Sequence, residues 1–123
     1  MGKFIIKKSG NGYTFNLKAT NGEIIGVNGQ VLSTMIVVKN SIESIAKNAP
    51  IAAIEDQTIE GYAVEANPKF EIYIDKAGEF RFRLKARNGE IILASEGYTT
   101  KANCKNGIES VRKNAVDAEI IEP

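Results

Sequence analysis

Four cationic side chains recur at every second residue of one short stretch, and they are the sequence's best candidates for a binding site. Apolar side chains alternate with them through residues 80–87, and the cations are Arg81, Arg83, Lys85 and Arg87. Because successive side chains of a β-strand point to opposite faces of a sheet, we expect the four cations to share one face. Tyr73, on the preceding predicted strand, is expected on the same face. Such a row is typical of a surface that binds the phosphates of a nucleic acid or another polyanion.

Nearby carboxylates favour a different interpretation of this row. If Asn88-Gly89 forms a two-residue hairpin turn, its register places Glu90 opposite Arg87 and Glu96 opposite Arg81. Cations with such partners form a solvated, charge-paired face. The sequence therefore leaves two alternatives for the row and Tyr73, a polyanion or interaction face and a charge-paired surface, and we favour the second.

Catalytic chemistry finds little support in the composition. The sequence contains no histidine, which removes the commonest general base near neutral pH and the commonest metal ligand. The single cysteine, Cys104, lies on the apolar stripe of a predicted helix, and we interpret it as a core side chain. Glu43 and Glu109 occupy matching positions in two repeated stretches, which indicates shared ancestry rather than a paired acid–base site. We therefore expect a protein that is not an enzyme and holds no cofactor and no metal.

The elements that would position these residues occur twice. Residues 3–56 align with residues 69–122, most clearly where 40–49 matches 106–115. Each copy predicts three strands, a helix and a short closing strand, and Asn-Gly predicts a type I′ turn between the second and third strands. We divide the chain into a first repeat (1–56), a linker (57–68) and a second repeat (69–123), which together build one compact domain.

The predicted helices each present one apolar stripe. Thr99 or Thr100 is the expected N-cap of the second helix, and Ser33 or Thr34 that of the first. The stripes are Val38, Ile42, Ile45 and Ala49 in the first copy and Cys104, Ile108, Val111 and Ala115 in the second. Three strands and one helix make a small core. We therefore expect the two copies to pair, so that both helices cover one face of a continuous sheet.

Several stretches resemble the YegP-like family, small and mostly bacterial proteins of unknown function. They read Lys-Phe-Glu-Ile-Tyr at 69–73, Phe-Arg-Phe-Arg-Leu-Lys-Ala-Arg-Asn-Gly-Glu at 80–90 and Asn-Gly-Ile-Glu-Ser-Val-Arg-Lys-Asn-Ala at 106–115. The resemblance implies an α+β fold of two tandem β-β-β-α-β repeats. It also implies one mainly antiparallel sheet, with two helices on one face and the closing strands exchanged between the repeats. It supplies no catalytic residues.

The functional expectation is a small binding or interaction module that acts through the open face of the sheet. This face is predicted to expose several apolar side chains, namely Ile5, Ile25, Val27, Ile92 and Ala94. The alternative function is nucleic-acid or other polyanion binding through the cationic row, although the net charge is only +1. The apolar runs are too short to span a membrane. We expect a bacterial cytoplasmic protein, a monomer rather than a homodimer, whose partner is another protein or a weakly bound nucleic acid.

Overall fold

The chain folds into eight strands and two helices in the computed structural model, which describes residues 2–123. The first repeat contributes β1 (Lys3–Ser9), β2 (Gly12–Lys18), β3 (Ile24–Val27), α1 (Met35–Asn48) and β4 (Ala53–Asp56). The second contributes β5 (Lys69–Ile74), β6 (Phe80–Lys85), β7 (Ile91–Ala94), α2 (Lys101–Ala115) and β8 (Glu119–Ile121). Both repeats therefore have the predicted order of three strands, a helix and a strand.

All the strands join one mixed sheet in the order β4-β5-β6-β7-β3-β2-β1-β8. Each closing strand pairs in parallel with the first strand of the other repeat, β4 with β5 and β8 with β1. The remaining neighbours are antiparallel. The mainly antiparallel sheet with exchanged closing strands is thus confirmed.

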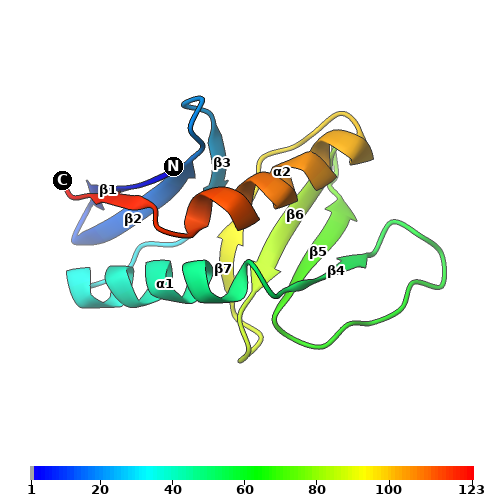
Figure 1. Ribbon diagram of the computed structural model, residues 1–123, viewed down its shortest axis with the longest axis horizontal. Coiled ribbons are helices and arrows are strands. Elements are labelled where there is room, and N and C mark those ends of the chain that lie inside the picture. Colours follow the sequence, from blue (N-terminus) through cyan, green and yellow to red (C-terminus); the bar gives the residue numbers. More distant parts are fainter. Residues whose placement is uncertain (1) are drawn as a thin grey trace.

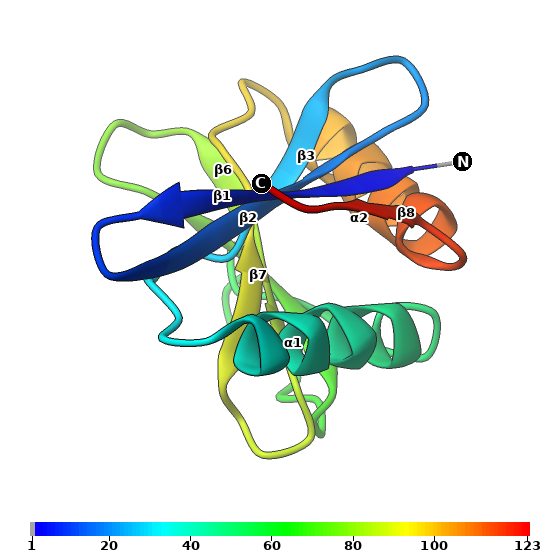
Figure 2. The same cartoon turned by 90° about the vertical axis from the view of Figure 1, so that its left-hand side faces the viewer.

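The two halves of the sheet meet where β3 pairs with β7. Val27 pairs antiparallel with Ala94, which is the residue at the equivalent position of the second repeat. A residue can oppose its own equivalent in this way only if an approximate twofold axis passes through the pair. The sheet twists strongly across this junction. In Figure 2, β1 and β2 therefore lie close to horizontal, whereas β7 lies close to vertical.

Both helices lie on the same face of the sheet (Figure 1). Thr34 and Thr100 are the N-caps, and each hydroxyl accepts a hydrogen bond from a backbone N–H of the first turn, at 3.2 and 3.1 Å. Both predicted apolar stripes are buried in a core that Phe4, Phe70 and Phe82 share with the helices. The predicted helix positions and their buried faces are confirmed.

The Asn-Gly turns differ from the prediction. Gly22 and Gly89 have positive φ angles of 87° and 84°, but Asn21 and Asn88 do not, so neither turn is type I′. In the second hairpin Gly89 N–H donates to the Ala86 carbonyl oxygen, and Ala86 N–H to the Glu90 carbonyl oxygen, both at 2.9 Å. This is a three-residue loop with a glycine bulge, so it adds one residue to the turn.

A second bulge in each hairpin restores the register. Leu84 pairs with Leu93 as predicted, whereas Lys85 pairs with Ile91 instead of Ile92. As a result Ile25 and Ile92, which we expected on the open face, are buried in the core. Ile24 and Ile91 are 43% and 44% exposed.

The linker forms turns and loop, and it lies beyond the edge strand β4 (Figure 1). Neither helix in residues 2–123 combines the length and apolar character that crossing a membrane requires.

Candidate interaction face and its ion cluster

The structure brings together four of the five candidate residues. Arg81, Arg83 and Lys85 lie on β6, and Tyr73 lies opposite Arg81 on β5. The Arg83 guanidinium carbon is 4.5 Å from the centroid of the Tyr73 ring, which is a cation–π contact. Arg87 is separated from them, because the turn places it beside α1, where it lines a pocket with residues of that helix.

Each of the three clustered cations already has a carboxylate partner. Arg81 Nε is 2.6 Å from Asp75 Oδ2, and Arg83 Nε is 2.6 Å from Glu71 Oε1. Lys85 Nζ is 3.3 Å from Glu71 Oε2. These partners come from β5 and the turn after it, rather than from Glu90 and Glu96 across the hairpin. The geometry of this part of the face is that of a charge-paired surface.

Sequence reasoning missed a buried ion cluster at one edge of the same face. Lys69 Nζ lies 2.7 Å from Glu55 Oε1 and 3.3 Å from Glu71 Oε2. The three side chains are 10%, 2% and 3% exposed respectively. The linker helps to enclose them, because Gln57 Nε2 donates to Glu55 at 2.6 Å and Glu65 N–H donates to Glu55 at 2.8 Å.

A signal for this cluster exists in the repeat alignment. In the other half of the sheet, the positions equivalent to Glu55 and Glu71 hold Ile121 on β8 and Ile5 on β1. Carboxylates in place of isoleucines within strands indicate a local environment that differs between the two halves. The first repeat offers only the lysine, Lys3, at the position of Lys69.

The cluster holds its carboxylates in the charged form. Burial alone would raise the pKa of Glu55, but hydrogen bonds from Lys69, Gln57 and the Glu65 backbone outweigh it and lower that pKa to about 2. Burial alone would also raise the pKa of Glu71, but hydrogen bonds from Arg83 and Lys69 outweigh it and lower that pKa. The hydrogen bond to Glu55 raises the pKa of Lys69.

Glu55 is therefore expected to make the protein less stable in acid. Between its ordinary pKa of 4.5 and its folded pKa of about 2, the unfolded chain binds more protons at Glu55 than the folded chain does. This contribution to stability is complete above pH 4.5 and is lost as the pH falls toward 2. We expect Glu55→Gln to lower the urea midpoint at pH 7, and the difference from wild type to shrink as the pH falls. Glu60→Gln, an exposed change in the same linker, is the control, and a constant difference for Glu55→Gln at all pH values would contradict the assignment.

The cysteine is not positioned for chemistry. Cys104 is fully buried on α2, and burial raises the pKa of its thiol to about 11. Within residues 2–123, no three Asp, Glu, Cys or His side chains gather as a metal site would require.

These features define a class of protein, a tandem-repeat α+β domain in which two halves exchange their closing strands. The chain belongs to the family described as "Domain of unknown function (DUF1508)", whose model matches residues 9–56 and 75–122. The resemblance to the YegP-like family is confirmed, because the UPF0339 protein YegP of Yersinia pestis is 39% identical over 98% of this chain and 94% of its own length.

Of two further relatives, one matches about one repeat of this chain and the other matches nearly the whole chain. The "UPF0339 protein in ptx operon 5'region" of Stutzerimonas stutzeri is 75% identical over 48 residues, which are 39% of this chain and 43% of that protein. The solution NMR structure of a UPF0339 protein from Shewanella oneidensis is 30% identical, with a TM-score of 0.79 over 98% of this chain and 90% of that one. The family carries no enzymatic name.

Proposed function

We propose that the protein is a small, non-enzymatic binding module whose contact surface is the open face, the face of the sheet turned away from α1 and α2. The proposal rests on one row of paired residues that crosses this face from β8 to β4. The row consists of Ile121, Ile5, Asn16, Val27, Ala94, Arg83, Glu71 and Glu55. Its end on β6, β5 and β4 is charged, whereas its end on β1 and β8 is apolar.

The observation that supports the proposal is the unequal cover of these two ends. The linker encloses Glu55 at the charged end, whereas Ile121, at the equivalent position of the apolar end, is 37% exposed. Asn16, next to Ile5 in the row, has a buried side-chain oxygen with no hydrogen-bond partner among residues 2–123. A protein segment that lies over β8, β1 and β2 would cover this apolar end as the linker covers the charged end.

The charge around the apolar end indicates the chemistry of the partner. Lys3 and Lys18 oppose each other across β1 and β2, and Lys7 lies further along the same face of β1. Like charges directly opposite are unfavourable in a sheet. We therefore infer an extended protein segment that combines apolar and acidic side chains, bound by a monomer in the cytoplasm.

Affinity capture from a bacterial lysate with matched variants tests this proposal. Ile5→Glu introduces the residue found at the equivalent position of the second repeat, and Lys7→Glu/Lys18→Glu reverses the charge. We expect both to lose a specific captured protein, which purified wild type then binds directly. Ile36→Glu, at an exposed position of α1, should retain it. Equal capture by Ile5→Glu and wild type would refute the role of the face.

The alternative function is polyanion binding through Arg81, Arg83, Lys85 and Arg87. It requires a phosphate to displace Asp75 and Glu71 from three of these cations. Fluorescence anisotropy with mixed-sequence RNA and DNA decides it, since affinity that falls steeply with salt would favour this alternative and absence of binding at low salt would exclude it.

A further inference from the structure

Each helix faces the hairpin turn of the other repeat across a polar cleft. The first cleft, of about 430 Å³, lies between α1 and the turn that joins β6 to β7. Its helix side consists of Asn40, Glu43, Ser44, Lys47 and Asn48. The second cleft, of about 420 Å³, lies between α2 and the turn that joins β2 to β3. Its helix side has the same residue type at each of the five equivalent positions, namely Asn106, Glu109, Ser110, Lys113 and Asn114. Exchange between the repeats thus builds two equivalent clefts, each from both repeats.

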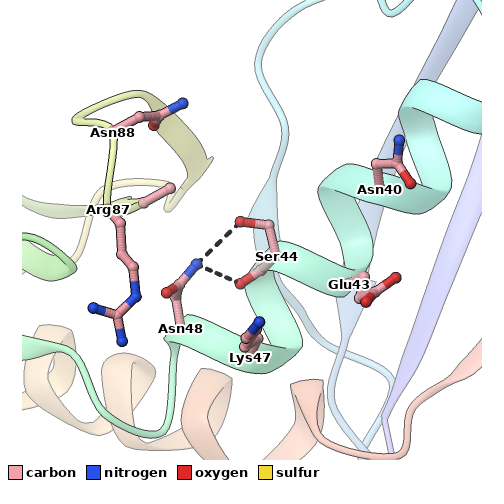
Figure 3. A pocket seen from close by; sticks show the side chains of 8 residues that line it. Asn40, Glu43, Ser44, Lys47, Asn48, Arg87 and Asn88 are labelled. Carbon is pink, nitrogen blue, oxygen red and sulfur yellow. Dashed lines mark hydrogen bonds between the residues drawn. The ribbon is translucent and has the colours of Figure 1, made fainter.

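A buried amide distinguishes the two clefts. Asn48 is 6% exposed, and its Nδ2 donates to the carbonyl and hydroxyl oxygens of Ser44 at 2.9 and 3.0 Å. Its Oδ1 has no hydrogen-bond partner among residues 2–123, and it points toward the side of the cleft where Arg87 lies (Figure 3). In the second cleft, Asn114 makes the same bonds to Ser110, but its Oδ1 accepts from the Thr20 hydroxyl at 3.3 Å.

This difference follows from one residue of the turn. Thr20 supplies the donor in the second cleft, and Arg87 stands at the equivalent position of the first. A buried acceptor without a protein partner costs free energy unless a molecule in the adjoining cleft supplies the donor. In the second cleft the amide oxygen of Asn114 already has a donor within the protein, so no ligand is required there.

The charges of the first cleft define the rest of the ligand. Lys47 and Arg87 form no ion pair with a carboxylate in residues 2–123, so both cations are available to an anionic group. Glu43 lies one turn from Lys47 on α1 and contributes a carboxylate that accepts hydrogen bonds. An anion that carries no hydroxyl group would be repelled by Glu43 and would leave Asn48 Oδ1 without a donor.

We propose that the first cleft binds one small hydroxyl-bearing ligand that carries an anionic group, a phosphorylated or carboxylated sugar. Lys47 and Arg87 hold the anionic group, while Asn48 Oδ1 and Glu43 accept hydrogen bonds from the hydroxyls. The site lies on the helix side of the sheet and is independent of the open face proposed above. Each chain binds one such ligand, because in the second cleft the Thr20 hydroxyl already donates to the equivalent amide oxygen, Asn114 Oδ1.

Titrations followed by amide NMR spectra test the site with four probes: glucose 6-phosphate, glucuronate, glucose and inorganic phosphate. We expect saturable shifts centred on Ser44, Asn48 and Asn88 with glucose 6-phosphate, with glucuronate, or with both, and these two arms distinguish a phosphate from a carboxylate ligand. Glucose and inorganic phosphate should each bind about tenfold more weakly, because glucose lacks the anionic group and inorganic phosphate lacks the sugar hydroxyls.

Variants in the two clefts provide matched controls. Lys47→Ala and Arg87→Thr should each weaken binding about tenfold or more, whereas Lys113→Ala, the equivalent change in the second cleft, should leave the affinity unchanged. Thermal melting checks that each variant is folded, and Lys47→Ala alone decides the question if Arg87→Thr does not fold. The proposal fails if no charged sugar gives saturable shifts at millimolar concentration, if inorganic phosphate binds as tightly as glucose 6-phosphate, or if Lys113→Ala weakens binding as much as Lys47→Ala. Ile5→Glu should bind the sugar normally, so that failure of one proposal leaves the other testable.

Discussion

Replacing Lys69 by methionine is expected to lower the free energy of unfolding at neutral pH by about 3–5 kcal/mol. Lys69 is the cation that lies between Glu55 and Glu71, and all three side chains are almost fully buried. Methionine fills a similar volume, so the variant removes the charge with little change in packing. Glu71 would keep Arg83 and Lys85, but Glu55 would lose its only ion pair within residues 2–123 and become a buried, uncompensated charge.

Urea unfolding at pH 7 measures this effect. The control is Lys3→Met, the same change at the equivalent lysine of the first repeat, whose side chain is 54% exposed and whose pair with Glu119 spans 4.0 Å. Exposed pairs of this kind contribute little, so we expect a loss of at most about 1 kcal/mol. Adding Glu55→Gln to Lys69→Met should recover part of the lost stability. Equal losses for Lys69→Met and Lys3→Met would show that burial does not strengthen the cluster.

The regular elements were predictable because each has a strong local signal. Alternation over residues 80–85 fixed β6, the 3.6-residue period fixed both helices, and the capping threonines fixed where the helices begin. The turn type was not predictable from Asn-Gly alone. Glycine with positive φ serves both a type I′ turn and a three-residue loop with a bulge, so the local sequence does not distinguish them.

The candidate site was less predictable because it depends on contacts between distant segments. Arg81, Arg83 and Lys85 were placed correctly on β6, but their carboxylate partners come from β5 and the turn that follows it. The ion cluster requires the linker to fold over Glu55, and the polar clefts require the exchange of the repeats. Neither arrangement has a signature within one strand or one helix. Arg87 was predicted on the open face for the same reason. The turn contains one more residue than the prediction assumed, and Arg87 therefore lies beside α1.

The junction of the two repeats explains one asymmetry that the duplication otherwise leaves puzzling. Gly26 and Leu93 occupy equivalent positions and lie next to the approximate twofold axis. A Cβ atom at Gly26 would lie 2.7 Å from Cγ and Cδ2 of Leu93, which is fully buried. A twofold axis brings equivalent side chains together, so two leucines would need the same volume. One glycine and one leucine fill it without overlap.

Exchanging this pair is therefore expected to be far less harmful than the two single changes predict together. Gly26→Leu overpacks the junction and should cost about 1–3 kcal/mol. Leu93→Gly leaves a cavity and a flexible strand residue, and should cost about 3–5 kcal/mol. In the double variant the leucine introduced at position 26 would occupy the volume that Leu93 vacates, so we expect it to be more stable than Leu93→Gly alone. A double-mutant cycle from urea unfolding measures a favourable coupling of about 1–3 kcal/mol. Losses that simply add, within about 0.5 kcal/mol, would mean that the two positions do not share one volume across the axis.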